Sequence, residues 1–446
     1  MRRAAVILAA GQGTRMRSSL PKVLHAVGGR PMLDWSIALA RDLGCDPVVV
    51  VGGTHNPAVN ARAAELGCAT AVQDPPLGTG HAVLSAKDAL GGFSGDIIVL
   101  YADSPFISGP SGAALFAALE AGAAAAVLGF EPPEPGAYGR LIEDADGALL
   151  AIVEAKEASP EQLAVRLCNA GVMAARAPAF WDSLSAVTND NAKGEYYLTD
   201  VIGLARTAGG TARAIRAAVA EVAGVNSKVE LAEAEAVFQA RMRIAAMEAG
   251  VTLVAPETVF FSWDTHLEAD VHIEPNVVFG PGVTVEAGAR IRAFCHLEDC
   301  IVRRGAILGP YARIRPGSDI GEDAHIGNFV ETKKARIGKG AKANHLAYLG
   351  DVTVGAKANI GAGTITCNYD GFDKHATEIG EGAFIGSDSM LVAPVKIGKG
   401  AYTGSGSTIT KDVPDDALSV ERSDQKIIPG WAARFRERKR GQKGTT

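Results

Sequence analysis

A six-residue period in the second half of the sequence constrains the fold more than any other feature. Aliphatic residues recur every six positions over 273–297, 302–326 and 379–409, and glycine follows many of them. A strict hexapeptide repeat predicts a parallel β-helix, in which each flat face takes about six residues and each coil about eighteen. Roughly 170 residues would then make on the order of nine to ten coils.

The period breaks twice, and each break inserts polar residues. The first break, between Ile326 and Ile337, contains 331–335, and the second, between Ile360 and Ile379, contains 368–374. Insertions in a solenoid form loops on its faces, where solenoids commonly place their sites. Several polar residues in and around these segments are not explained by the period, although each could be a solvated corner residue: Arg315, Lys333, His345, Tyr348, Asn359, Asn368, Tyr369 and Lys374.

The first half opens with a buried-strand pattern followed by a glycine loop. Residues 4–8 are continuously apolar, Gly11 and Gly13 follow, and Arg15 and Lys22 come next. Glycines let a backbone approach a ligand closely, and amide groups near basic side chains favour phosphates. Position 16 is Met, which excludes the Gly-x-Gly-x-x-Gly of dinucleotide-binding folds, and no P-loop follows. An ordinary turn is the alternative interpretation.

Strand and helix patterns then alternate. We expect helices over 31–43 and 57–66, and strands over 47–51, 69–73 and 96–100. The alternation predicts a mostly parallel, Rossmann-like α/β sheet, whose ligands bind beyond the carboxyl ends of the strands. Gln73, the glycine turn at 77–82 and Asp103 all follow such strand ends. At that place Asp103 would bind a cation or a hydroxyl, or else cap a helix.

A run of strong helix formers over 229–247, which stops at Gly250, predicts a rigid connecting helix. A chain of 446 residues is too long for one ordinary core. We therefore expect a first domain over 1–225, a linker helix over 226–250 and a β-helix domain over 251–446. The alternative assigns the helix to the first domain and moves only the boundary.

Charge and composition exclude several classes of protein. The formal net charge is −6 and the only concentrated basic run is 434–443, expected to be a solvated tail, so we expect no nucleic-acid partner. No apolar stretch reaches the ~18 residues of a membrane span, and none resembles a signal peptide, which predicts a cytoplasmic protein without membrane insertion. The six cysteines lack zinc or redox spacing, so we expect reduced thiols.

Longer motifs occur together and in order along both halves. In the first half they are 8–16, 21–25, 77–82, 101–103, 138–140, 152–154, 168–171, 194–200 and 224–226, and in the second half 327–331, 333–336, 345–351 and 359–371. Together they resemble the family of bacterial bifunctional N-acetylglucosamine-1-phosphate uridyltransferases/glucosamine-1-phosphate acetyltransferases. The resemblance covers both halves of the chain. It implies that the β-helix is left-handed and that the protein is a homotrimer.

For the first half, the resemblance implies a site for UTP and UDP-N-acetylglucosamine. Arg15 and Lys22 would act in catalysis by holding triphosphate oxygens, and Asp103 and Asn226 would bind Mg²⁺. The uracil would be read by Gln73, Gly78 and Thr79, and the sugar held by Gly139, Glu154, Asn169 and Tyr197. Leu8, Ala9, Gly11, Gly13 and Tyr101 would complete the site. Ala102 and Ala170 depart from the Gly and Thr that are usual in the family.

For the second half, the resemblance implies that His345 is the general base of acetyl transfer, a role that suits imidazole. Glu331 would orient the imidazole. Glucosamine-1-phosphate would be held by Arg315, Lys333, Tyr348, Asn359, Asn368, Tyr369 and Lys374. Acetyl-CoA would be bound by Ala362, Asn368, Tyr369, Ser387, Ser405 and Arg422, with Asn368 and Tyr369 acting across a subunit interface.

The implied function is bifunctional. Acetyl-CoA would acetylate glucosamine-1-phosphate, and UTP would convert the product to UDP-N-acetylglucosamine, a precursor of peptidoglycan and lipopolysaccharide. A second hypothesis keeps only the nucleotidyltransferase and gives the β-helix a role in oligomerisation. A third places zinc chemistry on the β-helix, where His296, His325, His345 and His375 are available, but their spacings do not correspond to whole coils.

Overall fold

The chain folds as two compact units, Met1–Met242 and Arg243–Thr446. The computed structural model describes residues 1–191 and 193–443. The division falls within helix α9, Lys228–Glu248, which occupies most of the span expected for a linker helix. The domain limits 1–225, 226–250 and 251–446 stay a prediction.

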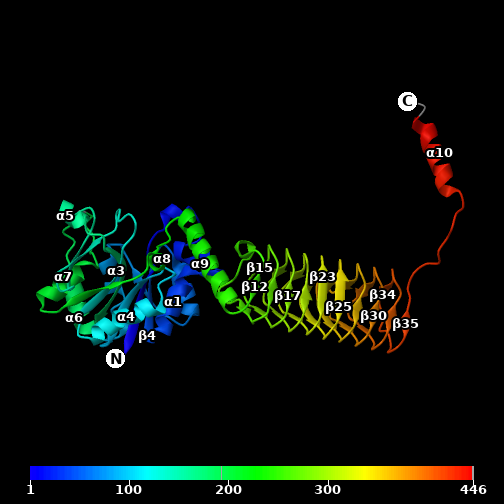
Figure 1. Ribbon diagram of the computed structural model, residues 1–446, viewed down its shortest axis with the longest axis horizontal. Helices are drawn as coiled ribbons and strands as arrows, with labels where there is room; N and C mark the ends of the chain where they lie inside the picture. Colours follow the sequence, from blue (N-terminus) through cyan, green and yellow to red (C-terminus); the bar gives the residue numbers. More distant parts are fainter. Residues whose placement is uncertain (192, 444–446) are drawn as a thin grey trace. The chain divides into compact units, whose positions relative to one another are not determined.

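The first unit is built on a nine-stranded sheet, which confirms the expected α/β class. Its main path runs β11-β7-β10-β6-β1-β4-β5 (Figure 1). Neighbouring strands are parallel except that β10 is antiparallel to β6, β7 and β8, and β8 is antiparallel to β9. The strands are β1 Arg3–Leu8, β4 Cys45–Gly53, β5 Ala69–Gln73, β6 Asp96–Tyr101, β7 Ala125–Phe130, β8 Arg140–Glu143, β9 Leu149–Val153, β10 Cys168–Arg176 and β11 Ala212–Arg216.

Both faces of this sheet are covered by helices. Alternate residues of a strand point to opposite sides, so each strand contributes to a hydrophobic cluster on either face. In β1, Ala4 and Val6 belong to one hydrophobic cluster, whereas Ala5 and Ile7 belong to another. Helices α3 Thr79–Ser85, α6 Ala177–Ser185 and α7 Asp200–Thr207 contribute to the first cluster. Helices α1 Met32–Asp42, α2 Pro57–Glu65 and α4 Gly109–Glu120 contribute to the second. The continuous apolar run over 4–8 is thus explained by burial on both sides.

Short segments complete the first unit. They are the two-stranded pair β2 Ala26–Val27 and β3 Arg30–Pro31, the single-turn helices α5 Pro160–Leu163 and α8 Val219–Val222, and the 3-10 helices η1 Thr14–Met16, η2 Lys22–Leu24 and η3 Asp88–Leu90. Helix η4, Pro256–Thr258, belongs to the second unit.

The second unit is a parallel β-helix, as the six-residue period predicts (Figure 1). One face is a ten-stranded parallel sheet with one strand from each successive coil, in agreement with the expected number of coils. Its strands are β12 Thr252–Leu253, β14 His272–Ile273, β17 Arg290–Ile291, β20 Ile307–Leu308, β23 His325–Asn328, β25 Lys342–His345, β27 Asn359–Ile360, β30 Phe384–Ile385, β33 Tyr402–Thr403 and β35 Leu418–Ser419.

The remaining faces form a fourteen-stranded sheet. Its strands are β13 His266–Leu267, β15 Val278–Phe279, β16 Val283–Val285, β18 His296–Leu297, β19 Cys300–Val302, β21 Arg313–Ile314, β22 Ser318–Ile320, β24 Glu331–Ile337, β26 Tyr348–Val354, β28 Ile365–Cys367, β29 Thr377–Ile379, β31 Met390–Val392, β32 Val395–Ile397 and β34 Thr408–Ile409. The long strand β24 contains residues 331–335, so the first break in the period forms an extended strand and not the expected loop, and the long strand β26 follows it.

Aromatic residues stack at one corner of the coils. Phe294, Tyr311 and Phe329 adopt the left-handed backbone conformation, and their ring centroids are 4.8 and 5.2 Å apart in succession. We call these three residues the aromatic ladder. Their exposed fractions are 49%, 45% and 56%. Exposed apolar groups in a row are typical of surfaces that contact another molecule.

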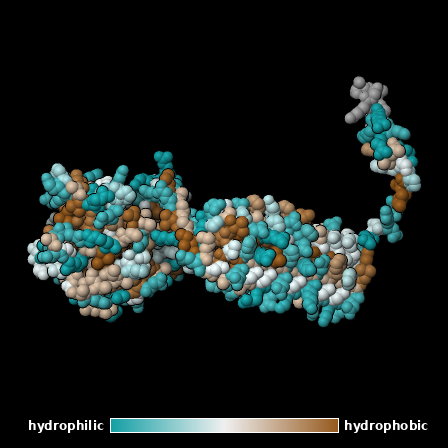
Figure 2. All heavy atoms as spheres, in the orientation of Figure 1, coloured by the Kyte–Doolittle hydropathy of each residue, from teal (hydrophilic) through white to brown (hydrophobic). Residues whose placement is uncertain are grey.

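The basic run near the end of the chain belongs to helix α10, Trp431–Lys443. Its residues 431–440 are exposed, as expected for a solvated tail, although a helix was not expected. Ile427 and Ile428 precede it and are also exposed. Figure 2 shows hydrophobic atoms on the surface beside this helix. Among the described helices, none is both long and apolar enough to cross a membrane. All six cysteines carry free thiols.

Candidate active sites

A pocket of about 360 Å³ lies beyond the carboxyl ends of β1, β5 and β6. Most of the residues expected to bind UTP line it together: Leu8, Ala9, Gly11, Lys22, Gln73, Gly78, Thr79, Tyr101 and Asp103. Arg15 is exposed in η1 and does not line this pocket. The structure therefore brings the first glycine loop, the second glycine turn and the end of β6 around one cavity.

Two glycines allow the chain to close around the pocket. Gly13 has a φ of +60°, and a Cβ at this position would lie 2.6 Å from Cβ of Lys22. Gly78 has a φ of +105°, and its Cβ would lie 2.7 Å from the carbonyl oxygen of Tyr196. A larger residue at either position would meet both backbone strain and a clash. Gly11, in contrast, has open space around its Cβ position.

Lys22 joins two oxygens from distant parts of the chain. Its ammonium Nζ donates to Asp103 Oδ2 at 2.5 Å and to Asn226 Oδ1 at 2.9 Å. The Lys22 side chain is only 11% exposed and that of Asp103 20%. Asp103 and Asn226, which are expected to share a metal ion, thus direct their oxygens at one point, and the ammonium group of Lys22 occupies it.

Hydrogen bonds of the main chain anchor the two residues that carry these oxygens. The Val225 amide donates to the Asp103 carbonyl at 2.9 Å, which ties the end of β6 to the segment before α9. The Asn226 amide donates to Glu230 Oε2 at 2.6 Å, and the Glu230 amide donates to Ser227 Oγ at 3.2 Å. These two contacts resemble a capping box at the start of a helix, except that the Glu230 carboxylate accepts from the residue before Ser227. Glu230 is a positioning residue that sequence reasoning missed.

The residues expected to read uracil are fixed by local hydrogen bonds. Gln73 is 6% exposed, and its Nε2 donates to the Gly78 carbonyl at 2.9 Å. The Thr79 hydroxyl accepts a hydrogen bond from the Leu198 amide at 3.1 Å. Burial raises the pKa of the Tyr101 hydroxyl, so this side chain stays neutral.

The residues expected to hold the sugar form a second group beside β8, β9 and β10. The Asn169 amide donates to the Gly139 carbonyl at 2.8 Å, and Glu154 Oε1 lies 3.5 Å from the Cβ position of Gly139. Burial raises the pKa of the Glu154 carboxyl, against the opposing effect of Lys193. Burial and nearby carboxylates, Glu154 among them, raise the pKa of Tyr197. None of the four lines the pocket described above.

In the β-helix, His345 belongs to a column of residues at equivalent positions of successive coils. Strand pairing aligns Asn328 with His345 and Ala343 with Ile360, so Ala362 follows next. Ile360 pairs with Ile385, which aligns Ala362 with Ser387. Phe384 pairs with Tyr402, which aligns Ser387 with Ser405. We call Asn328, His345, Ala362, Ser387 and Ser405 the corner column. Arg422 joins its far end, because its Nη1 donates to the Ser405 carbonyl at 2.8 Å.

The imidazole of His345 has a partner other than the expected one. Its Nδ1 lies 3.1 Å from Asn328 Oδ1. Glu331, expected to orient the ring, instead accepts from Arg315 at 2.6 Å and pairs with Arg313 at 3.6 Å. That expectation is therefore wrong in this structure, because two guanidinium groups hold the carboxylate by charge-assisted contacts. Asn328 was missed, although it precedes His345 by one coil.

Three basic side chains, Arg315, Lys333 and Lys374, come together beside strand β24. The hydrogen bond and repulsion from Lys374 hold the pKa of the Lys333 ammonium below its ordinary value, and Arg315 adds to the effect. Clustered cations of this kind favour a phosphate. Lys333 lies on β24 and is aligned with Gly350 on β26.

Close packing at Gly350 brings two more expected residues together. A Cβ at Gly350 would lie 2.5 Å from the Tyr348 hydroxyl and 2.8 Å from Asn368 Nδ2. Asn368 is 7% exposed and donates to Asp351 Oδ2 at 2.5 Å, whereas Tyr369 is 59% exposed. Asn359 lies one coil above Lys342, on the ten-stranded face.

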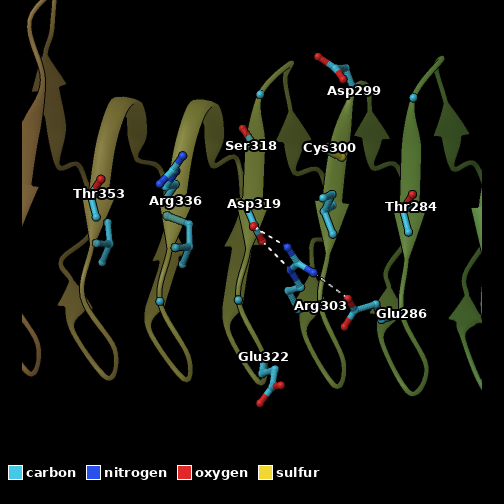
Figure 3. Close-up of a pocket in the computed structure, with 17 residues that line it drawn as sticks. Thr284, Glu286, Asp299, Cys300, Arg303, Ser318, Asp319, Glu322, Arg336 and Thr353 are labelled. Carbon is cyan, nitrogen blue, oxygen red and sulfur yellow. Dashed lines mark hydrogen bonds and ion pairs between the residues drawn. The ribbon is translucent and has the colours of Figure 1, made fainter.

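A further groove of the β-helix lies away from these residues. A groove of about 910 Å³ runs across the fourteen-stranded sheet, and Arg303 bridges Glu286 and Asp319 within it at 2.9 and 2.8 Å (Figure 3). None of the residues expected to bind glucosamine-1-phosphate or acetyl-CoA lines it. Within the described residues, no group of three or more His, Cys, Asp or Glu side chains converges as a metal site would require. The zinc hypothesis therefore gains no support from His296, His325, His345 and His375.

Comparisons with known proteins cover both units. Residues 5–160 match the family model of the MobA-like NTP transferase domain, and residues 376–411 match the bacterial transferase hexapeptide (six repeats). A protein of Maricaulis maris named "Bifunctional protein GlmU" is 58% identical over 99% of this chain and 98% of its own length. A protein of the same name from Hyphomonas neptunium is 61% identical over 99% of this chain and 96% of its own length. Another from Jannaschia sp. is 54% identical over 98% of this chain and 96% of its own length.

Proposed function

The chain belongs to the GlmU family of bifunctional proteins. From this membership we propose which residues of each unit serve which of the two reactions. The chain acetylates glucosamine-1-phosphate with acetyl-CoA and transfers a uridylyl group from UTP to N-acetylglucosamine-1-phosphate, which yields UDP-N-acetylglucosamine. The observation that carries this conclusion is the near-complete alignment with bifunctional relatives, which includes both the nucleotide pocket and the corner column. A β-helix that served only oligomerisation would have no need of that column.

In uridylyl transfer, an oxygen of the sugar phosphate attacks the α-phosphorus of UTP, and the bond to the bridging oxygen breaks to release pyrophosphate. We propose that Lys22 and Arg15 hold the triphosphate, Gln73, Gly78 and Thr79 the uracil, and Gly139, Glu154, Asn169 and Tyr197 the sugar. The chain then acts by positioning and by charge neutralisation, without a covalent intermediate. The buried Lys22 and the preformed pocket support this role.

Mg²⁺ would be held by Asp103 and Asn226. The donor set fits, because a carboxylate and an amide oxygen fixed by backbone contacts already converge on a cationic group. Few protein oxygens suffice for Mg²⁺, which keeps waters and substrate phosphates as further ligands. When bound, the ion would supply charge stabilisation at the α-phosphate and the departing pyrophosphate.

In acetyl transfer, we propose that His345 Nε2 takes the proton from the sugar amine as its nitrogen attacks the thioester carbonyl. The carbon–sulfur bond then breaks, and the CoA thiolate leaves and takes up a proton. The contact with Asn328 supports this assignment, because an Nδ1–H that donates to the amide oxygen leaves the lone pair on Nε2. Arg315, Lys333 and Lys374 would hold the sugar phosphate, with Tyr348 and Asn359 at its hydroxyls.

The corner column would hold acetyl-CoA along the helix axis through Ala362, Ser387, Ser405 and Arg422. Hexapeptide domains favour oligomers, and we propose a homotrimer in which Asn368 and Tyr369 complete a neighbouring site. The exposed aromatic ladder next to the corner column is a suitable contact surface. The free thiols agree with a cytoplasmic protein.

Two substitutions test the division of labour. We expect Asp103→Ala to abolish pyrophosphate release from UTP and to spare the release of free CoA thiol from acetyl-CoA. His345→Ala should have the reverse effect. Loss of both activities in either variant, with the oligomer intact, would contradict two separate sites. A wild-type protein that released no thiol would favour the non-catalytic β-helix.

A further inference from the structure

Lys22 occupies the point at which a metal ion would bind to Asp103 and Asn226. Its Nζ is 2.5 Å from one oxygen and 2.9 Å from the other. Mg²⁺ needs its oxygen ligands at about 2.0–2.1 Å. An ammonium and a divalent ion cannot share these two oxygens at such distances, both because of their volumes and because of their like charges.

The lysine is aimed at this point by its surroundings. Pro21 precedes it, and the left-handed Gly13 leaves room for the lysine, because a Cβ at Gly13 would lie 2.6 Å from the Lys22 Cβ. The side chain is 11% exposed, so water screens the contact weakly. The backbone of both residues is anchored without the lysine, because the Asp103 carbonyl accepts from the Val225 amide and the Asn226 amide donates to Glu230.

We propose that Lys22 is an internal counter-ion that blocks the metal site until a triphosphate arrives. The phosphates of UTP offer the ammonium a new set of anionic oxygens within the same pocket, which lets it leave Asp103 and Asn226. Metal and nucleotide therefore bind with positive coupling, and the free enzyme has low affinity for the metal alone. This inference rests on the proposed metal role of the two oxygens.

The coupling has a functional consequence. A divalent ion bound without nucleotide would neutralise Asp103 and leave the pocket to bind a bare triphosphate or pyrophosphate. With the lysine in place, the divalent ion binds only together with the triphosphate, so the cation and the anion that the reaction requires enter the pocket at the same time. Lys22 then stays in the pocket as a phosphate ligand.

The experiment measures binding of Mn²⁺ alone to the full-length protein by the loss of the electron paramagnetic resonance signal of free Mn²⁺. We expect Lys22→Met to bind Mn²⁺ at least about tenfold more tightly than the wild type, a factor that corresponds to about 1.4 kcal/mol. Lys228→Met is the matched control, because it removes the same charge nearby but contacts His25, 3.1 Å from its Nδ1, and not the two oxygens. The control should stay within about threefold of the wild type.

The gain must also come from the proposed site. Adding Asp103→Asn to Lys22→Met should remove it. Equal affinities in Lys22→Met and Lys228→Met, or a gain that survives Asp103→Asn, would overturn the inference. Uridylyl transfer by the wild type is measured in parallel, so that failure of the proposed function is recognised separately from failure of the counter-ion role.

Discussion

The contact between Asn328 and His345 predicts a specific kinetic defect. In Asn328→Ala, the Nδ1–H loses its acceptor at 3.1 Å, and the ring loses the contact that fixes its tautomer and orientation. A hydrogen bond of this kind contributes about 0.5–1.5 kcal/mol in net, which corresponds to roughly a two- to tenfold effect on a rate. The side chain of His345 is exposed, which favours the lower half of that range.

The assay is the release of CoA thiol at varied glucosamine-1-phosphate. Because Asn328 contacts the ring and not the cation cluster, we expect kcat to fall by about two- to fivefold and KM to change little. Uridylyl transfer by the same variant is the internal control and should be unchanged. Asn328→Asp keeps an acceptor but adds a charge that stabilises the imidazolium, so the acid limb of its pH–rate profile should move to higher pH. An unchanged kcat in Asn328→Ala, or a rise in KM alone, would refute the assigned orientation.

Three further predictions concern the two units separately. Gly13→Ala should lower stability by about 1–2 kcal/mol in thermal or urea unfolding and impair uridylyl transfer, because of its positive φ and the 2.6 Å approach to Lys22. Glu230→Ala should raise the metal concentration needed for uridylyl transfer, since Asn226 loses its 2.6 Å contact; Glu233→Ala, exposed on the same helix, is the control. Tyr311→Glu should break the oligomer in light scattering and abolish acetyl transfer only, and a trimer that persists would exclude the aromatic ladder as its contact.

Much of the architecture follows from patterns that a single sequence contains. The six-residue period identifies the β-helix because inward aliphatic side chains must repeat with each flat face. The alternation of strands and helices identifies the α/β sheet, and glycines at strand ends identify its binding edge. Gly13 and Gly78 then have the tight approaches that such loops require.

Other features depend on spatial register, which the period alone does not give. Members of the corner column from Asn328 to Ser405 are 17, 17, 25 and 18 residues apart, because loops of different length interrupt the coils. Asn328 could therefore not be matched to His345 from spacing. The partner of Glu331 could not be predicted from spacing either. Whether the carboxylate contacts His345 or Arg315 depends on which side chain lies next to it across the sheet.

The two scaffolds impose different shapes on their sites. In the α/β sheet, loops from several strand ends surround one cavity, so Lys22, Asp103 and Asn226 can meet although they are far apart in sequence. A β-helix offers only repeated corners, and a site on it must extend along the axis. From Asn328 to Ser405 the corner column climbs four coils, or about 19 Å at the ~4.8 Å spacing of neighbouring strands. Such a geometry would suit a long, extended acyl carrier, and in the function proposed above the short sugar phosphate falls to the cation cluster of Arg315, Lys333 and Lys374.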